Sequence, residues 1–134
     1  WGMQVAVTAA GGAVRKGQNG SHRGIAHEIN INENGLRHPL YKDKDKIFNT
    51  PAFNYDEVAT LPSNATLLSS NKVNNVMGLN FKFASANIWG IQYHPEITYE
   101  NELNSHIKII EDEIKITDKN SRMKELKNWL DLIS

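Results

Sequence analysis

A histidine and a glutamate separated by one proline are the residues best placed to do chemistry. His94, Pro95 and Glu96 follow the largely apolar run of residues 88–93. In an extended chain, side chains two positions apart point to the same side. The carboxylate can therefore hold the imidazole in one tautomer and stabilise its cation, and the fixed φ of Pro95 stiffens the pair. A histidine near a strand end is structural more often than catalytic, so the carboxylate is what favours catalysis.

The nucleophile that would complete a catalytic triad is not evident. The chain contains no cysteine, and none of its serines lies in a recognisable motif. The lack of cysteine also excludes a disulfide and a thiolate metal site within these residues. The other histidines have no ligand-like spacing to a carboxylate, so we predict no metal and no cofactor. Among them, His27 is expected in the core or an interface and His38 in a turn.

Length and charge limit the remaining function classes. The 134 residues fit one domain. Basic and acidic residues number 15 each, and this balance argues against binding to nucleic acid or to an anionic membrane. No apolar run approaches the roughly 20 residues of a membrane span, and the amino end does not resemble a signal peptide. We expect a cytoplasmic protein, and the first residue, Trp1, suggests that the sequence begins inside a longer one.

The first half of the chain predicts a helix followed by strands. Residues 1–10 are small and apolar on nearly all sides, and Gly11-Gly12 follows, which predicts a short buried helix closed by glycine. Residues 13–24 are typical of a loop. Residues 25–32 alternate as a strand does and are followed by a turn at Asn34-Gly35. One face of that strand is expected to carry Ile25, His27, Ile29 and Ile31.

The second half predicts further strands and then two helices. Residues 47–53 should form an edge strand, because Pro51 cannot donate to a sheet ladder. Residues 65–70 predict a short strand, and residues 76–94 an antiparallel hairpin. After Pro95 the apolar period becomes helical, which predicts two helices. Their buried faces are expected to carry Leu103, Ile107, Ile110 and Ile114 in the first and Met123, Leu126, Leu130 and Ile133 in the second.

Two short motifs resemble a known family. GIQYHPE, residues 90–96, resembles the GVQFHPE signature of class I (triad-type) glutamine amidotransferases, whose His and Glu complete a Cys-His-Glu triad. The opening WGMQ resembles the end of that family's nucleophile elbow, G-x-C-x-G-x-Q. The resemblance implies that His94 and Glu96 are catalytic and that the cysteine immediately precedes Trp1.

Longer segments are similar to the GMP-synthase-like group of that family. They are GIAHEININENGLRHPLY at 24–41, PAFNYDEVATLPSNATLLSSN at 51–71 and RMKELKNWL at 122–130. The group often has histidine where this chain has Asn54. The resemblance implies that the backbone around Tyr55 and Asp56 binds the α-groups of glutamine. The alternative, that Asp56 and Glu57 form a solvated strand end, is equally open.

The resemblance also implies a fold and a mechanism. Residues 1–134 would be the carboxyl-terminal part of one flavodoxin-like α/β amidotransferase domain, without its front parallel strands and its nucleophile. The Trp1 N–H would bind the oxyanion, Gly2 would allow a tight turn, and Gln4 would contact the substrate, glutamine. Ammonia would pass to an acceptor synthetase domain or subunit. This chain alone is expected to be inactive because it lacks the cysteine.

Two alternatives stay open at this point. A γ-glutamyl peptide hydrolase of the same fold would keep His94 but take a longer γ-linked substrate. A non-catalytic homologue would keep the fold to bind or regulate a partner, and Asn54 slightly favours it.

Overall fold

A computed structural model describes residues 1–97 together with residues 104, 108 and 128. Apart from these last three residues, the two helices predicted after Pro95 lie outside the described residues and stay predictions. The described elements, in chain order, are α1 (Gly2–Ala9), β1 (Ala13–Lys16), β2 (His22–Ile31), α2 (Glu33–Leu36), the 3₁₀ helix η1 (Pro39–Tyr41), β3 (Ile47–Asn54), β4 (Asp56–Thr60), β5 (Thr66–Ser70), β6 (Gly78–Phe83) and β7 (Ala86–Ile91).

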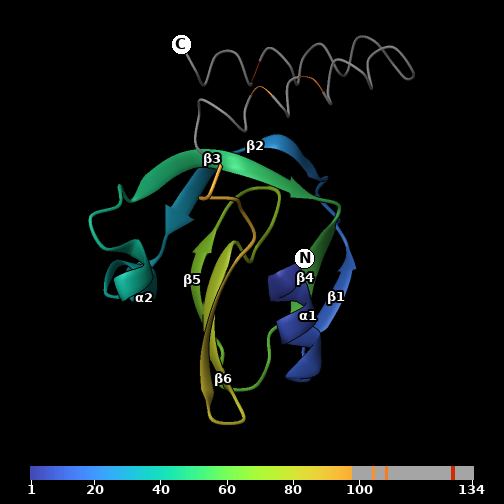
Figure 1. Ribbon diagram of the computed structural model, residues 1–134, viewed down its shortest axis with the longest axis vertical. Coiled ribbons are helices and arrows are strands. Elements are labelled where there is room, and N and C mark those ends of the chain that lie inside the picture. The colour runs from blue at the N-terminus through green and yellow to red at the C-terminus, as the bar shows by residue number, and fades with distance from the viewer. Residues whose placement is uncertain (98–103, 105–107, 109–127, 129–134) are drawn as a thin grey trace.

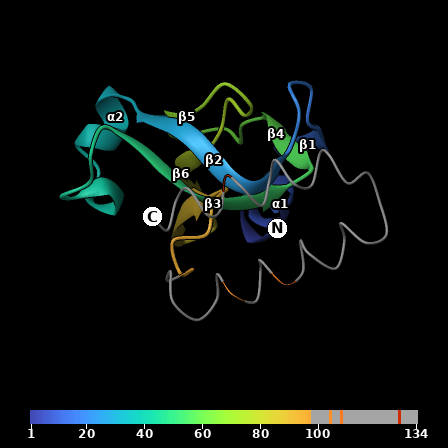
Figure 2. The ribbon, with the colours of Figure 1, turned by 90° about the horizontal axis from the view of Figure 1, so that it is seen from above.

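Two antiparallel sheets form the described part of the chain. β1 pairs with β4, and a five-stranded sheet has the order β3-β2-β5-β6-β7. Helix α1 lies beside β1 and β4 (Figure 1) and also contacts β7. Viewed from above, β2 and β3 run side by side (Figure 2), in agreement with their long antiparallel pairing. As predicted, β3 is an edge strand, and β6 and β7 form the predicted hairpin.

Helix α1 is buried on one face rather than on nearly all sides. Met3 and Val7, four residues apart and therefore on one helix face, are buried, whereas Val5 is about half exposed. The predicted glycine ending is confirmed. Gly11 takes a left-handed φ of +87°, a conformation that favours glycine, and its N–H bonds to the Thr8 carbonyl.

The prediction of a loop over residues 13–24 is wrong, because β1 and the start of β2 lie there. Strand β1 is short and mostly exposed, so it has no apolar period for sequence reasoning to detect. Its pairing with β4 joins residues about forty positions apart. The turn expected at Asn34-Gly35 is a short helix instead, because the Asn32 side chain caps it by accepting from the Gly35 N–H at 2.9 Å.

A bulge in β2 corrects the predicted strand face. The register with β3 shifts between Ala26 and Ile29, and Glu28 adopts a positive φ of 50°. The extra residue moves the side chains that follow to the opposite side of the strand. Ala26, Ile29 and Ile31 are therefore the buried set, and His27 is exposed rather than in the core.

The core consists of two clusters. One lies around Ile29, Ile31, Leu68 and Met77 and includes the buried Tyr41 and Tyr93. The other joins Met3 and Val7 of α1 to Val58, Leu79 and Phe81. The second cluster packs the helix against the β6–β7 hairpin and so places the amino end of α1 near the end of β7.

Candidate active site

His94 and Glu96 meet as the sequence predicts, although the chain there is not extended. β7 ends at Ile91, and the Ile97 N–H bonds to the His94 carbonyl, so the pair lies in a turn. Nδ1 of His94 lies 2.5 Å from Oε1 of Glu96. The His94 N–H also donates to the Pro51 carbonyl on edge strand β3, at 2.8 Å. The turn and the edge strand together hold the backbone of His94, and the contact with Glu96 orients the imidazole.

The Glu96 carboxyl is held in its ionised form. Desolvation pushes the pKa of this carboxyl upward, but hydrogen bonds from His94 and from its own backbone N–H, together with the His94 charge, outweigh it and lower the pKa. The side chains of His94 and Glu96 remain 40% and 64% exposed, respectively, so solvent reaches both. An ionised carboxylate on Nδ1 leaves Nε2 of His94 as the nitrogen that can exchange protons.

A cleft of about 360 Å³ places this pair next to the amino end of α1. Its walls include Trp1 and Gly2 at that helix end, Phe53 on β3, and His94 and Glu96. The first N–H groups of a helix have no intrahelical partner and carry a positive partial charge, so this end of the cleft favours an anion. The cleft therefore combines a proton acceptor with a place for developing negative charge.

The glycine that begins GIQYHPE has a packing reason. A side chain at Gly90 would come within 2.7 Å of Cγ of Met3, so glycine allows α1 to lie directly on β7. At Gly2, by contrast, a side chain would meet no described atom within 4 Å. The predicted tight-turn role of Gly2 has no steric support from the described residues and stays a prediction, as does the oxyanion role of Trp1.

The predicted substrate residues are only partly brought together. Nε2 of Gln4 donates to the Asp56 carbonyl at 2.9 Å and lies 3.5 Å from Oε1 of Gln92. The exposed Tyr55 instead stacks under the Arg23 guanidinium, 5.0 Å from the ring centroid. Gln92, which is buried beside Gln4, was missed by sequence reasoning, although it lies within GIQYHPE.

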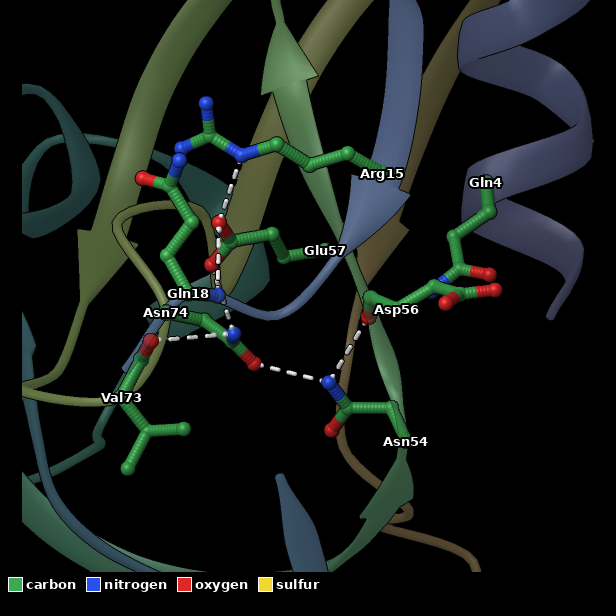
Figure 3. Close-up of polar contacts among 8 residues, drawn as sticks. All are labelled: Gln4, Arg15, Gln18, Asn54, Asp56, Glu57, Val73 and Asn74. Carbon is green, nitrogen blue, oxygen red and sulfur yellow. Dashed lines mark hydrogen bonds and ion pairs between the residues drawn. The ribbon is translucent and has the colours of Figure 1, made fainter. Parts of the chain in front are cut away.

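Glu57 is not a solvated strand end. It is buried and accepts hydrogen bonds from Arg15, Asn74 and the Gln18 N–H (Figure 3). Desolvation raises the pKa of its carboxyl, but these bonds and the Arg15 charge outweigh that effect and lower it. Asp56, the neighbouring residue, is exposed. The alternative of a solvated strand end therefore holds for Asp56 only.

The described residues provide neither a metal cluster nor a membrane helix. No group of three or more His, Asp or Glu side chains in that part of the chain could hold a metal ion. None of the helices that those residues form has the length and apolar character needed to span a bilayer.

Comparison with known proteins decides the family. The family model described as glutamine amidotransferase class-I matches residues 1–115. This chain belongs to the class I glutamine amidotransferase family. Its similarity to glutamine-hydrolysing GMP synthase subunits of two archaea places it in the GMP-synthase-like group, as the quoted motifs suggested.

Two curated relatives illustrate the range of the family. A γ-glutamyl-L-1-hydroxyisopropylamide hydrolase of a Pseudomonas species is 34% identical over 101 residues, covering 73% of this chain and 34% of that protein. The glutamine-hydrolysing GMP synthase subunit of Methanoculleus marisnigri is 29% identical over 98 residues, covering 73% of this chain and 50% of that protein. The chain thus spans a third to a half of the length of these relatives.

A solved structure shows the fold of this amidotransferase chain. It resembles a glutamine amidotransferase of Thermotoga maritima with a TM-score of 0.68 and 20% identity, over 96% of this chain and 55% of that one. The fold is therefore part of the flavodoxin-like α/β domain of class I amidotransferases, as predicted. The strand pairs among the described residues are all antiparallel.

Proposed function

We propose that the protein hydrolyses the side-chain amide of glutamine through a Cys-His-Glu triad, with residues 1–134 as the carboxyl-terminal part of its amidotransferase domain. The observation that carries this proposal is the 2.5 Å contact between His94 and Glu96 in a cleft that also holds the amino end of α1. Membership of the amidotransferase family supports the same reaction class.

The nucleophile in this proposal is a cysteine immediately before Trp1 in the full-length protein. A helix amino end and a neighbouring imidazole both lower the pKa of a thiol, and the cleft supplies both. The 134 residues contain no cysteine, so this chain alone would be inactive. The full-length protein would carry out the reaction.

Each side chain then has one role in the proton transfers. His94 takes the thiol proton at Nε2, and the resulting thiolate attacks the amide carbon. His94 then gives the proton to the amide nitrogen as the carbon–nitrogen bond breaks and ammonia leaves. Glu96 holds Nδ1 and stabilises the imidazolium. The Trp1 N–H donates to the oxyanion, an interaction typically worth about 3 kcal/mol. Water then hydrolyses the glutamyl thioester and releases glutamate.

The substrate end of the site would lie where α1 meets β4. Gln4 and the backbone at Tyr55 and Asp56 would bind the α-groups of glutamine, which is consistent with the bond between Gln4 and the Asp56 carbonyl. The ammonia would pass to an acceptor on a synthetase domain or on a synthetase partner chain, as the names of the GMP synthase relatives suggest.

A second candidate is hydrolysis of a γ-glutamyl amide without transfer of ammonia. It is favoured by the 34% identity to a γ-glutamyl-L-1-hydroxyisopropylamide hydrolase. The same triad would act, but an amine would leave in place of ammonia. A non-catalytic homologue is the remaining alternative, and it requires a residue other than cysteine before Trp1.

The test is ammonia release by the full-length protein, after its coding sequence upstream of Trp1 has been read. Cysteine before Trp1, ammonia release from glutamine, and loss of release in His94→Ala are the expected results. Turnover of γ-glutamyl alkylamides without turnover of glutamine would favour the second candidate. A residue other than cysteine at that position would overturn both catalytic proposals.

A further inference from the structure

A chain of buried side-chain hydrogen bonds leads from β2 to the substrate end of the proposed site. Nδ1 of His22 lies 2.8 Å from Oδ1 of Asn54. Nδ2 of Asn54 donates to Oδ1 of Asn74 at 2.8 Å and to the Asp56 carbonyl at 3.0 Å. Nδ2 of Asn74 in turn donates to Glu57 at 3.1 Å. His22, Asn54, Asn74 and Glu57 are all buried.

The direction of each bond is fixed by its neighbours. Both hydrogens of the Asn54 amide are used, so its Oδ1 must accept from Nδ1–H of His22. Nε2 of His22 then accepts from Nδ2 of Asn71, at 3.0 Å. The oxygen of Asn71 cannot replace that nitrogen, because it accepts from the Val73 and Asn74 N–H groups. The network therefore requires neutral His22 with its proton on Nδ1.

The Asp56 carbonyl links this network to the site. It accepts from Nδ2 of Asn54 on one side and from Nε2 of Gln4 on the other. Figure 3 shows Asn54, Asp56 and Gln4 next to one another where β3 turns into β4. Because one carbonyl carries both bonds, rotation of the Asn54 amide would move the group to which Gln4 is anchored.

We propose that His22 and Asn54 are a positioning pair, in which His22 fixes the Asn54 amide and Asn54 holds the Asp56 carbonyl in place for Gln4 and the glutamine substrate. The proposal rests on the proposed function for its substrate. It assigns a role to Asn54, at the position where the GMP-synthase-like group often has histidine. Neither residue touches the reacting atoms, so the effect should fall on substrate binding.

The kinetic test replaces the Asn54 amide by a carboxylate of the same shape. Asn54→Asp keeps an acceptor for His22 but loses both donated bonds. In the full-length protein we expect KM for glutamine to rise about tenfold and kcat to stay within about twofold. Asn49→Asp is the matched control on the same strand: Asn49 is exposed and its Oδ1 accepts from the Glu28 N–H, a role that a carboxylate keeps. It should leave both constants unchanged.

A second pair of variants covers the case in which Asn54→Asp does not fold. His22→Asn keeps a donor near the position of Nδ1, whereas His22→Leu removes it. KM should rise less in His22→Asn than in His22→Leu. Equal KM values in these two variants, or a fall in kcat with KM unchanged in any of the Asn54 and His22 variants, would overturn the positioning role.

Nuclear magnetic resonance tests the pair without reference to activity. Nitrogen–proton correlations of the full-length protein at neutral pH should show His22 protonated on Nδ1 alone. Protonation on Nε2, or on both nitrogens, would overturn the network. If the wild-type protein releases no ammonia from glutamine, the proposed function fails and the positioning role fails with it. Normal release with KM unchanged in Asn54→Asp would refute the positioning role alone.

Discussion

The His94–Glu96 pair and the buried network around Glu57 each depend on a carboxylate whose pKa is lowered, but they use it differently. Glu96 is 64% exposed and lies two residues from its partner. Glu57 has a side chain only 6% exposed, and its partner Arg15 is 42 positions away. An exposed pair adds little to the free energy of unfolding, whereas a buried carboxylate that loses its partners is costly.

This contrast separates the region with a proposed chemical role from the region with a structural one. The exposed pair is open to solvent, and we expect its substitution to have little effect on folding. The buried network holds β1, β4 and the loop after β5 together. Substitutions in the two regions should therefore affect different measurements, activity for the first and stability for the second.

The largest effect is expected from His94→Ala. Without the imidazole, no group remains to take the thiol proton, so kcat/KM for glutamine in the full-length protein should fall about 10⁴-fold. The urea midpoint should hardly change, because the His94 side chain is 40% exposed. Ammonia release and urea unfolding of the same preparation check both parts. A large loss of stability would show that His94 is structural.

Glu96→Gln should be the milder change in the same region. The amide keeps the shape of the side chain but loses the charge that stabilises the imidazolium, so we expect kcat to fall about 10²-fold with KM nearly constant. Glu33→Gln is a control, since Glu33 is an exposed carboxylate of α2 that pairs with Arg37 at 3.8 Å. An equal fall in kcat in the control would exclude a specific role for Glu96.

The same contrast explains what sequence could predict here. The contact between His94 and Glu96 and the β6–β7 hairpin follow from local patterns, and both predictions are confirmed. Strand β1 and the Arg15–Glu57 bond were missed because they depend on contacts between distant residues. The prediction of which face of β2 is buried was wrong, because one bulged residue reverses the alternation of side chains without altering the sequence pattern.

Glu57→Gln should mainly lower stability. Arg15, Asn74 and the Gln18 N–H all donate to the Glu57 carboxylate. The glutamine side chain has an NH₂ group in place of one carboxylate oxygen, so at least one buried hydrogen bond is lost and two donors face each other. We expect the free energy of unfolding to fall by about 2 kcal/mol. Glu33→Gln should change it by less than about 0.5 kcal/mol. Urea unfolding measures both, and equal effects would contradict the contrast between the regions.

The smallest expected effect is a decline in the free energy of unfolding at mildly acidic pH, caused by His22. Burial lowers the pKa of His22 below 6.5, the hydrogen bond with Asn54 offsets part of this, and the charge of His27 adds to the lowering. The titratable and charged groups on the surrounding elements are Arg23, His27 and Glu28 on β2, Lys72 after β5, and Asp56 and Glu57 on β4.

The sign follows from which state binds the proton first. As pH falls below 6.5, the unfolded chain protonates His22 while the folded chain does not, so stability should decline until the folded pKa is reached. Glu57 behaves differently: its lowered pKa stabilises the fold above about pH 4.5, and that contribution is lost only below it. His22→Asn should reduce the decline of stability below pH 6.5. It should leave unchanged the loss of stability below about pH 4.5 that is due to Glu57. An unaltered slope just below pH 6.5 in that variant would show that neutral His22 is not what holds the network.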